Sequence, residues 1–342
     1  MKNTFEVLLG LGGKKEDSPE LEKATNIKKE ISEITQGKNL DDLALEDLKA
    51  VLAKYKEIAT VLEISETEPS SDVREQIKNA KEILGEKAVL GVEEVEKAFG
   101  IKIKPEQVPS ILFSKEDLER AKELNQFLIL RIDKSSDSKP LTIEKMNEIL
   151  KGKVKDETKA LYSDDGSGKI KDDAWYKSED FASKETPKLS WALTSKEIIP
   201  DSTSKNYLQQ TEVIINYIKK DVFKGKKIPV EFQTAIDEFD EVKDEIEKLI
   251  GDDPEKASEI LEGLQITKLT RQTPAEALYD ILVYFQNNKE RLLENKYTWT
   301  SRRASAGRLV FVGRFDAGGA YVGGGGSDDS GGDLGVAFSR SL

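Results

Sequence analysis

The sequence predicts an α+β fold, on three observations. Apolar residues recur at three- and four-residue steps over long stretches of the first 300 residues, which is the pattern of helices with one buried face. Residues 127–132 (Phe-Leu-Ile-Leu-Arg-Ile) form a short apolar run with β-branched members, typical of a buried strand. Near the C-terminus the helical pattern stops, and two β-type runs flank a stretch rich in glycine.

Residues 1–100 are predicted to form an all-α N-terminal region. One helix there carries its apolar side chains on a single face, formed by Leu45, Leu48, Leu52, Tyr55, Ala59 and Leu62. Similar spacing predicts helices over 27–34 and 73–84, with a stop and an N-cap at 69–72 and helix ends at Gly37 and Gly85. We expect a small helical bundle rather than an oligomerising stalk, because the heptad patterns are short.

Shorter elements follow this region. Residues 101–104 alternate as a strand would, and Ser114 and Thr142 stand where each would cap a helix. Residues 175–176 and 189–193 also have strand character.

Three long amphipathic helices are then predicted, over about 205–223, 230–250 and 274–295. Pro274 suits the first turn of the last helix.

The acidic segment 163–173 invites comparison with a calcium-binding loop. With Gly168 as the turn glycine, the first ligand would be Ser163, and the last, which should be a bidentate glutamate, would be Ala174. We therefore interpret the segment as an ordinary surface turn and expect no metal site.

Composition excludes several classes of function. The chain has no Cys and no His, which removes disulfides, thiolate nucleophiles, the usual zinc sites and imidazole base catalysis. A net charge of -12 argues against a nucleic-acid partner, because phosphate binding requires a positive field. No segment has the apolar length of a membrane span and no signal peptide is evident, so we expect a cytoplasmic protein by default, with surface display by another route open. We expect no cofactor.

The tail is a different kind of sequence from the rest. From Ser301 to Leu342 there is no Lys, Glu, Gln or Asn, and eleven of the 24 glycines of the chain lie here. Residues 308–312 and 334–338 are strand-like and flank the glycines, so we expect a folded tail whose last strand completes a sheet rather than a flexible linker. A phosphate-binding loop is not indicated, because neither a Lys nor a helical pattern follows the glycine cluster 323–326.

The tail resembles the C-terminus of variable proteins of diversity-generating retroelements. The resemblance lies in Tyr297-Thr-Trp-Thr300, Gly307-Arg-Leu-Val310, Val312-Gly313, Phe315-Asp316, Val322, Leu334-Gly-Val336 and Phe338-Ser-Arg-Ser341. It extends upstream through segments 127–131, 184–191 and 195–206, and covers roughly residues 110–342.

This resemblance implies a C-type-lectin-like domain over residues 101–342, with a helical insertion at about 205–295 and a variable region at about 300–342. In such proteins a reverse transcriptase copies a template with errors at adenines, so an AAC codon for Asn can become a codon for several other residues. Framework side chains would face the core and variable ones a ligand. Carbohydrate binding is not implied, because lectin-type calcium ligands are not recognisable.

The resemblance then assigns a variable, ligand-binding surface. Its sixteen residues are Phe311, Arg314, Ala317, Gly319, Ala320, Tyr321, Gly323, Gly324, Gly325, Gly326, Asp329, Ser330, Gly331, Gly332, Asp333 and Ala337. Among tail residues, Tyr321, Phe315, Arg314 and Asp316 would be the main contacts, with core packing an equal alternative for Phe315. Trp191 and Trp299 are expected in the core.

The function expected is therefore ligand binding without catalysis, with an unknown protein or other macromolecular ligand as partner. One alternative is a helical adaptor or structural protein with an inert glycine-rich tail. A carboxylate-based enzyme is a third, although no paired acidic motif stands out. The formylglycine-generating relatives of this fold depend on cysteine chemistry, which this chain lacks.

Overall fold

The structure is a computed structural model that describes residues 54, 73–104, 107–151 and 175–342. The chain divides into two compact units, Met1–Asp72 and Val73–Leu342, and the second holds almost all of the described residues. The sequence placed the boundary near residue 100. The difference has a physical cause, since the segment from Val73 to Phe99 pairs with and packs against the elements that follow.

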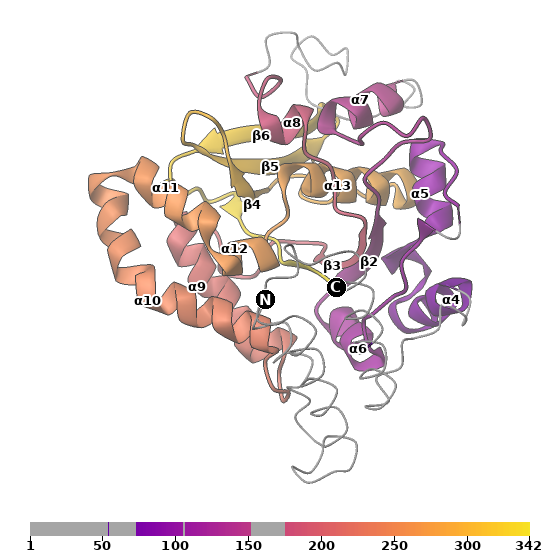
Figure 1. Cartoon of the computed structure of the whole chain (residues 1–342), viewed down its shortest axis with the longest axis horizontal. Coiled ribbons are helices and arrows are strands. Elements are labelled where there is room, and N and C mark those ends of the chain that lie inside the picture. The colour runs from indigo at the N-terminus through magenta and orange to yellow at the C-terminus, as the bar shows by residue number, and fades with distance from the viewer. Residues whose placement is uncertain (1–53, 55–72, 105–106, 152–174) are drawn as a thin grey trace. The chain divides into compact units, whose positions relative to one another are not determined.

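The second unit contains both helices and strands, as expected of an α+β protein (Figure 1). Its helical elements are α4 (Val73–Leu84), η2 (Glu86–Ala88), α5 (Val92–Phe99), α6 (Lys115–Glu123), α7 (Ile143–Lys151), α8 (Asp180–Ser183), α9 (Tyr207–Tyr217), η4 (Ile218–Val222), α10 (Val230–Asp252), α11 (Pro254–Gly263), α12 (Gln265–Thr270) and α13 (Pro274–Asn288). Its strands are β1 (Val89–Leu90), β2 (Gln126–Arg131), β3 (Ser190–Ser195), β4 (Tyr297–Arg303), β5 (Leu309–Asp316), β6 (Gly319–Gly325), β7 (Leu334–Gly335) and β8 (Ser339–Ser341).

Two four-stranded sheets organise these elements. In the first, the order is β1-β2-β3-β8, with a parallel β1–β2 pair and antiparallel pairs beyond it. In the second, the order is β6-β5-β4-β7, with antiparallel pairs except for β4–β7. Of the strand-like run predicted over 334–338, only Leu334–Gly335 forms a strand, β7, and β8 follows directly after the run and joins the other sheet.

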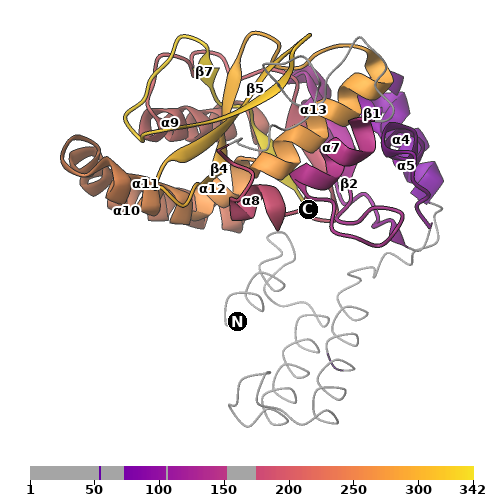
Figure 2. The ribbon, with the colours of Figure 1, turned by 90° about the horizontal axis from the view of Figure 1, so that it is seen from above.

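Helix α13 lies at the centre of the main core (Figure 2). Every residue from Pro274 to Phe285 except Glu276 is buried, and the helix contacts β2, β4, β5 and α5. The sequence assigned it to a helical insertion, whereas the structure gives it the position of a core helix. It ends at Asn288, earlier than predicted, where Lys289 takes a left-handed conformation.

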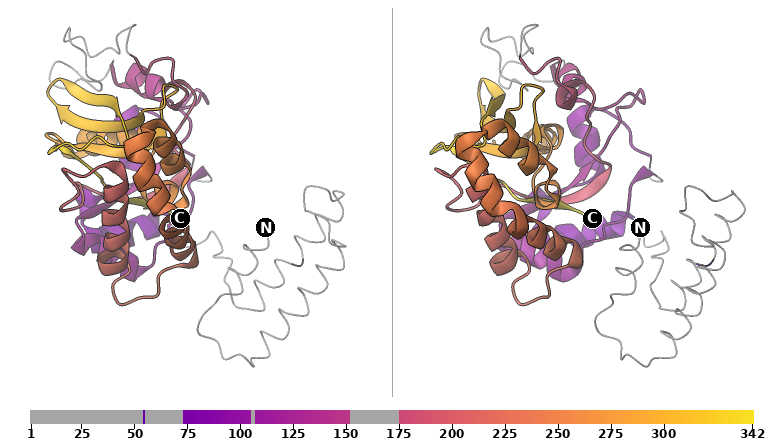
Figure 3. Two further views of the ribbon diagram at one scale, coloured as in Figure 1. Left: turned by 90° about the vertical axis from the view of Figure 1, so that its left-hand side faces the viewer. Right: turned by 60° about the vertical axis from the view of Figure 1, so that its left-hand side comes forward.

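A second core forms where α9 to α12 meet the C-terminal strands. In both views of Figure 3 the yellow strands lie beside these orange helices. Trp299, Leu309 and Phe338 from the tail pack there with apolar residues of α9, α10 and α11. The tail is therefore part of the folded core.

None of the described helices is long and apolar enough to span a membrane.

Several local predictions are confirmed. Ser114 caps α6 in a capping box with Asp117, and the Thr142 hydroxyl accepts a hydrogen bond from the backbone N–H of Lys145 at the start of α7. Trp191 and Trp299 are buried.

Two strand predictions are wrong. Residues 101–104 form no strand, because Ile103 donates its N–H to the carboxylate of Glu96 instead of to a neighbouring strand. Trp175 and Tyr176 lie in a turn, although both rings still pack against other aromatic residues. The predicted helices over 27–34 and 45–62 and the acidic segment 163–173 lie outside the described residues, apart from Lys54.

Candidate functional site: the outer face of the glycine-rich sheet

The sheet β6-β5-β4-β7 has one face in the main core and one face turned away from it. The side chains of Val310, Val312 and Val322 point to the same face of the sheet and are buried in the main core. The intervening residues Phe311 and Tyr321 lie on the opposite face, because successive side chains of a strand point to opposite sides. Tyr321 is 37% exposed and Phe311 is half-buried.

Aromatic rings on three adjacent strands meet on this outer face. Tyr297 packs against Phe311 with ring centroids 5.1 Å apart and against Tyr321 at 6.0 Å, and Phe311 stacks on Tyr321 at 6.5 Å. The Trp299 ring also packs against Phe311, with ring centroids 5.3 Å apart. We call Tyr297, Phe311 and Tyr321 the aromatic face.

Glycine makes this arrangement possible. Gly313 pairs with both Tyr297 and Tyr321, so the two rings meet across a residue that has no side chain. Gly323 pairs with Phe311, and a Cβ on Gly323 would lie 2.3 Å from that ring. Gly323 therefore leaves no empty space, because the Phe311 ring of the neighbouring strand covers it.

Arg314 lies beside the aromatic face on a β-bulge of β5. Its φ of 44° is unusual for a residue with a side chain, and its N–H donates to the carbonyl of Lys296 at 2.7 Å. The guanidinium is exposed, and its contact with Tyr297 raises the Arg314 pKa. The bulge thus turns a cation towards solvent next to the aromatic rings.

The segment after β6 is held by the helices on its other side. Tyr207 donates its N–H to the carbonyl of Ser327, and Ser204 donates to the carbonyl of Gly331. The Ser327 hydroxyl is buried and donates to the carbonyl of Pro254. These bonds fix residues 326–333 while leaving Asp328, Asp329 and Ser330 exposed.

The structure places the sixteen predicted surface residues in three groups. Seven are exposed: Arg314, Ala317, Tyr321, Asp329, Ser330, Gly332 and Asp333. Four are half-buried: Phe311, Gly324, Gly326 and Gly331. Five are buried: Gly319, Ala320, Gly323, Gly325 and Ala337.

The five buried residues correct the expectation that all sixteen face a ligand. Ala320 lies on the inner face of β6 with Val322, and Ala337 donates its N–H to the Thr298 hydroxyl in the interior. Gly325 is enclosed because a Cβ there would meet Asp329 at 2.3 Å and Trp299 at 2.9 Å.

Of the two interpretations open for Phe315, the structure favours core packing, since Phe315 is fully buried against Phe285. Asp316, a predicted contact, is half-buried. Tyr297, which the resemblance placed among the framework residues, is half-buried on the aromatic face and also packs against the second core. No sequence signal distinguished Tyr297, because residues two apart on a strand share a face with each other and Trp299 was expected in the core. The faces of β4 could not be assigned without its partner strands.

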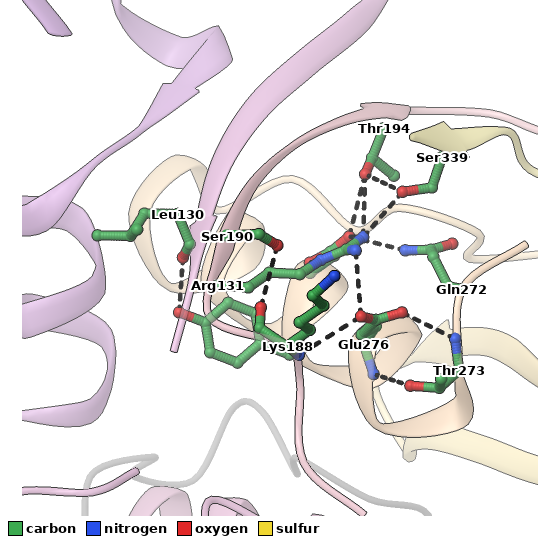
Figure 4. Close-up of polar contacts among 11 residues, drawn as sticks. Leu130, Arg131, Lys188, Ser190, Thr194, Gln272, Thr273, Glu276 and Ser339 are labelled. Carbon is green, nitrogen blue, oxygen red and sulfur yellow. Dashed lines mark hydrogen bonds and ion pairs between the residues drawn. The ribbon is translucent and has the colours of Figure 1, made fainter. Parts of the chain in front are cut away.

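A buried polar cluster lies elsewhere in the unit, at the N-terminal end of α13 (Figure 4). Arg131 at the end of β2 forms two hydrogen bonds with Asp280, of 3.0 and 2.6 Å, and donates to the Ser339 hydroxyl at 2.9 Å. Asp280 also accepts from Thr194 and from Gln272. Despite burial, which acts in the other direction, Asp280 and Glu276 hold the Arg131 pKa above its ordinary value. The cluster joins α13 to three strands of the first sheet.

In the described part of the chain, no group of three or more Asp or Glu side chains is placed to hold a metal ion. Comparisons with protein-family models, with curated proteins and with solved structures find no match to this chain.

Proposed function

We propose that this chain is a ligand-binding display protein, which presents the aromatic face and the adjoining segment 326–333 to a protein or other macromolecular partner. The observation that carries the proposal is the aromatic face, where rings of β4, β5 and β6 gather on the side of the sheet turned away from the main core. Core residues such as Val312 and Val322 supply the packing, while Phe311 and Tyr321 stand on the other side of the same strands. Aromatic and Arg side chains supply much of the energy in protein interfaces, and both are present here.

The separation of core residues from outward-facing residues along the tail also supports diversification of the tail by a retroelement. A surface can vary from copy to copy only if its residues contribute little to folding. Arg314, Ala317, Tyr321, Asp329 and Ser330 are exposed and meet this condition. We further propose a C-type-lectin-like scaffold, in which the chain end returns as β8 to pair with β3 and so anchors the variable segment at both ends.

The inert-tail alternative is less well supported. An inert tail would not contribute Trp299, Leu309 and Phe338 to a core shared with four helices.

Two matched libraries test the display proposal. One randomises the five exposed positions 314, 317, 321, 329 and 330, and the other randomises the five buried positions 310, 312, 320, 322 and 336. Most members of the first should fold with melting temperatures within a few degrees of the parent, since exposed substitutions usually change stability by about 0.5 kcal/mol or less. Most members of the second should not fold. Equal losses in both libraries would refute a display surface, and so would failure to select binders to any protein target from the first.

The retroelement proposal has a separate genomic test. We expect a near-copy of the DNA that encodes residues 300–342, differing only at adenines of the template, beside a reverse transcriptase gene. Genes from different cells should then differ at the codons of exposed tail residues. A tail of constant sequence across many cells would contradict diversification while leaving ligand binding open.

A further inference from the structure

We infer that this protein has a second binding site, for a phosphate-bearing small molecule, in a cavity at the N-terminal end of α13. The cavity has a volume of about 660 Å³, within the size range of small-molecule sites. It lies where the polar cluster of Figure 4 meets α12 and β4. None of the sixteen residues assigned to the variable surface lines it, so the inference does not depend on the display function.

The charge of the lining points to an anion. Six cationic side chains line the cavity, namely Arg131, Lys184, Lys188, Lys268, Arg271 and Arg302, against the two carboxylates of Glu185 and Glu276. This excess stands out in a chain of net charge -12. Glu185 is paired with Arg302 at 2.7 Å, and Glu276 is engaged in the capping box of α13. Both carboxylates of the lining therefore already have hydrogen-bond or ion-pair partners within the protein.

Three of the six cations are paired, Arg131 with Asp280, Lys184 with Asp180 and Arg302 with Glu185, and the other three have no anionic partner among the described residues. Lys188 and Lys268 are exposed, and neither forms an ion pair with the residues that the structure describes. Lysines at the rim of a polar cavity can turn their ammonium groups towards a bound anion, because their four-carbon stems are flexible.

Arg271 is the strongest single indication. Only 3% of it is exposed, and it donates from one guanidinium nitrogen to the Thr211 hydroxyl and the Tyr207 carbonyl. Its other two nitrogens, Nε and Nη1, have no hydrogen-bond partner among the described residues. Burial lowers the Arg271 pKa, and no described carboxylate offsets this effect. The guanidinium also lies over the Tyr207 ring, with Cζ 3.8 Å from the ring centroid, but this contact leaves the three N–H groups of Nε and Nη1 without acceptors. Unpaired buried donors are costly, and a bound ligand would complete their hydrogen bonding.

The remaining lining residues suit a phosphate better than an apolar or cationic molecule. Thr273, Ser301, Ser339 and Ser341 line the cavity and offer hydroxyl groups that can donate to oxygen atoms. The fifteen-residue helix α13 begins here, and the positive end of its dipole favours negative charge. A phosphate group presents three or more acceptor oxygens and up to two charges, whereas a carboxylate presents two oxygens and one charge.

Calorimetric titration of the full chain with pyrophosphate tests the inference. Ionic strength is held constant with sodium chloride, because screening alone would change any electrostatic binding. We expect saturable binding of pyrophosphate and weaker binding of orthophosphate. Lys188→Gln and Lys268→Gln should each weaken pyrophosphate binding about fivefold to tenfold, which is the size expected for loss of one charge-assisted hydrogen bond near solvent. Both lysines are exposed, so both variants should keep the melting temperature of the parent.

Lys248→Gln on α10 is the matched control, since Lys248 is also exposed but does not line the cavity. It should bind pyrophosphate as the parent does, and so should Tyr321→Ala on the aromatic face. Absence of saturable binding would overturn the inference, as would unchanged affinity in both cavity variants. Citrate binding as tight as that of pyrophosphate would also overturn it, by showing a site for anions in general.

Discussion

At the scale of single residues, glycine occurs at different positions of the tail for different structural reasons. Gly307 and Gly319 have positive φ values, which favour glycine. A Cβ on Gly323 would lie 2.3 Å from the tip of the Phe311 ring, so the ring would have to move. At Gly324 the nearest atom to a Cβ would be in ordinary contact at 3.4 Å, so no neighbour demands glycine there. A glycine-rich composition therefore does not identify a linker. It can equally arise where aromatic rings lie over a strand.

Gly313 gives the sharpest residue-scale prediction. A Cβ there would lie 2.2 Å from the Lys296 carbonyl oxygen and 2.7 Å from the Tyr297 Cα, and neither backbone atom can move without shifting β4. Gly313→Ala should therefore lower the free energy of unfolding by roughly 2–4 kcal/mol, measured by urea denaturation. Gly324→Ala in the neighbouring strand is the control and should change stability by roughly 1 kcal/mol or less. Equal effects of the two substitutions would contradict the close approach of β4 and β5.

At the scale of elements, the buried pair between Arg131 and Asp280 attaches α13 to the first sheet. Both side chains are almost fully buried, and Asp280 accepts hydrogen bonds from Arg131, Thr194 and Gln272. Breaking a buried pair from one side leaves the other charge uncompensated, which is more damaging than removing both.

Asp280→Asn should accordingly destabilise the fold strongly. The amide has the size of the carboxyl but cannot neutralise Arg131, so we expect a loss of roughly 3–5 kcal/mol in the free energy of unfolding. Asp240→Asn, at an exposed position of α10, is the matched control and should have almost no effect. Denaturation curves of the two variants provide the measurement, and similar stability of both would show that the pair contributes little.

Elements with strong local patterns could be predicted, and those that depend on distant partners could not. The N-cap at Ser114 and the apolar run of β2 involve only neighbouring residues, and both are found as expected. The alternation in residues 101–104 is equally clear, yet none of the strands in the described part of the chain pairs with them. Strands were predicted only on either side of the glycine-rich stretch, yet its first part forms β6, because pairing with β5 fixes it.

The aromatic face and the cavity also differ in how far they could be predicted from local sequence. The outward position of Tyr321 could be anticipated from the resemblance, but the role of Tyr297 required knowledge of which face of β4 is covered. The cavity could not be anticipated, because its cations come from segments far apart in the sequence. One signal was present: Asp280 stands alone as an acidic residue within the apolar stretch 277–285, which indicates a buried partner.

At the scale of the whole unit, the end of the chain fastens together parts that are distant in sequence. Arg340 on β8 lies between the rings of Phe113 and Phe223 and donates to the carboxylate of Asp117 on α6 at 3.0 Å. Ser339 meanwhile joins the Arg131 cluster. The last strand is short, but it contacts several other elements.

The ion pair between Asp117 and Arg340 should make the free energy of unfolding depend on pH in the acidic range. Although burial acts against it, Arg340 and the hydrogen bonds of Ser114 hold the Asp117 pKa below its ordinary value. A lowered pKa in the folded state adds stability that is complete above the unfolded pKa of about 3.9 and is lost as pH falls through the folded value. Stability curves at pH 7 and pH 3 should show Asp117→Asn about 1 kcal/mol less stable than the parent at pH 7, with the difference shrinking at pH 3. A constant difference would mean that the carboxylate charge is not involved.

Truncation tests the fastening role of the chain end directly. A chain that stops after Phe338 lacks β8, so it leaves β3 with an unpaired edge, removes the Ser339 hydroxyl from Arg131 and removes Arg340 from Asp117. Loss of a few buried polar contacts at roughly 1–3 kcal/mol each would take most of the stability of an ordinary domain, so this variant should be unfolded or melt far below the parent. Removal of Leu342 alone, which is 49% exposed and outside β8, should leave the melting temperature unchanged. A truncated chain that melts with the parent would show that the glycine-rich sheet is held without its C-terminal anchor, and the display proposal would then lose the rigid support on which a variable surface depends.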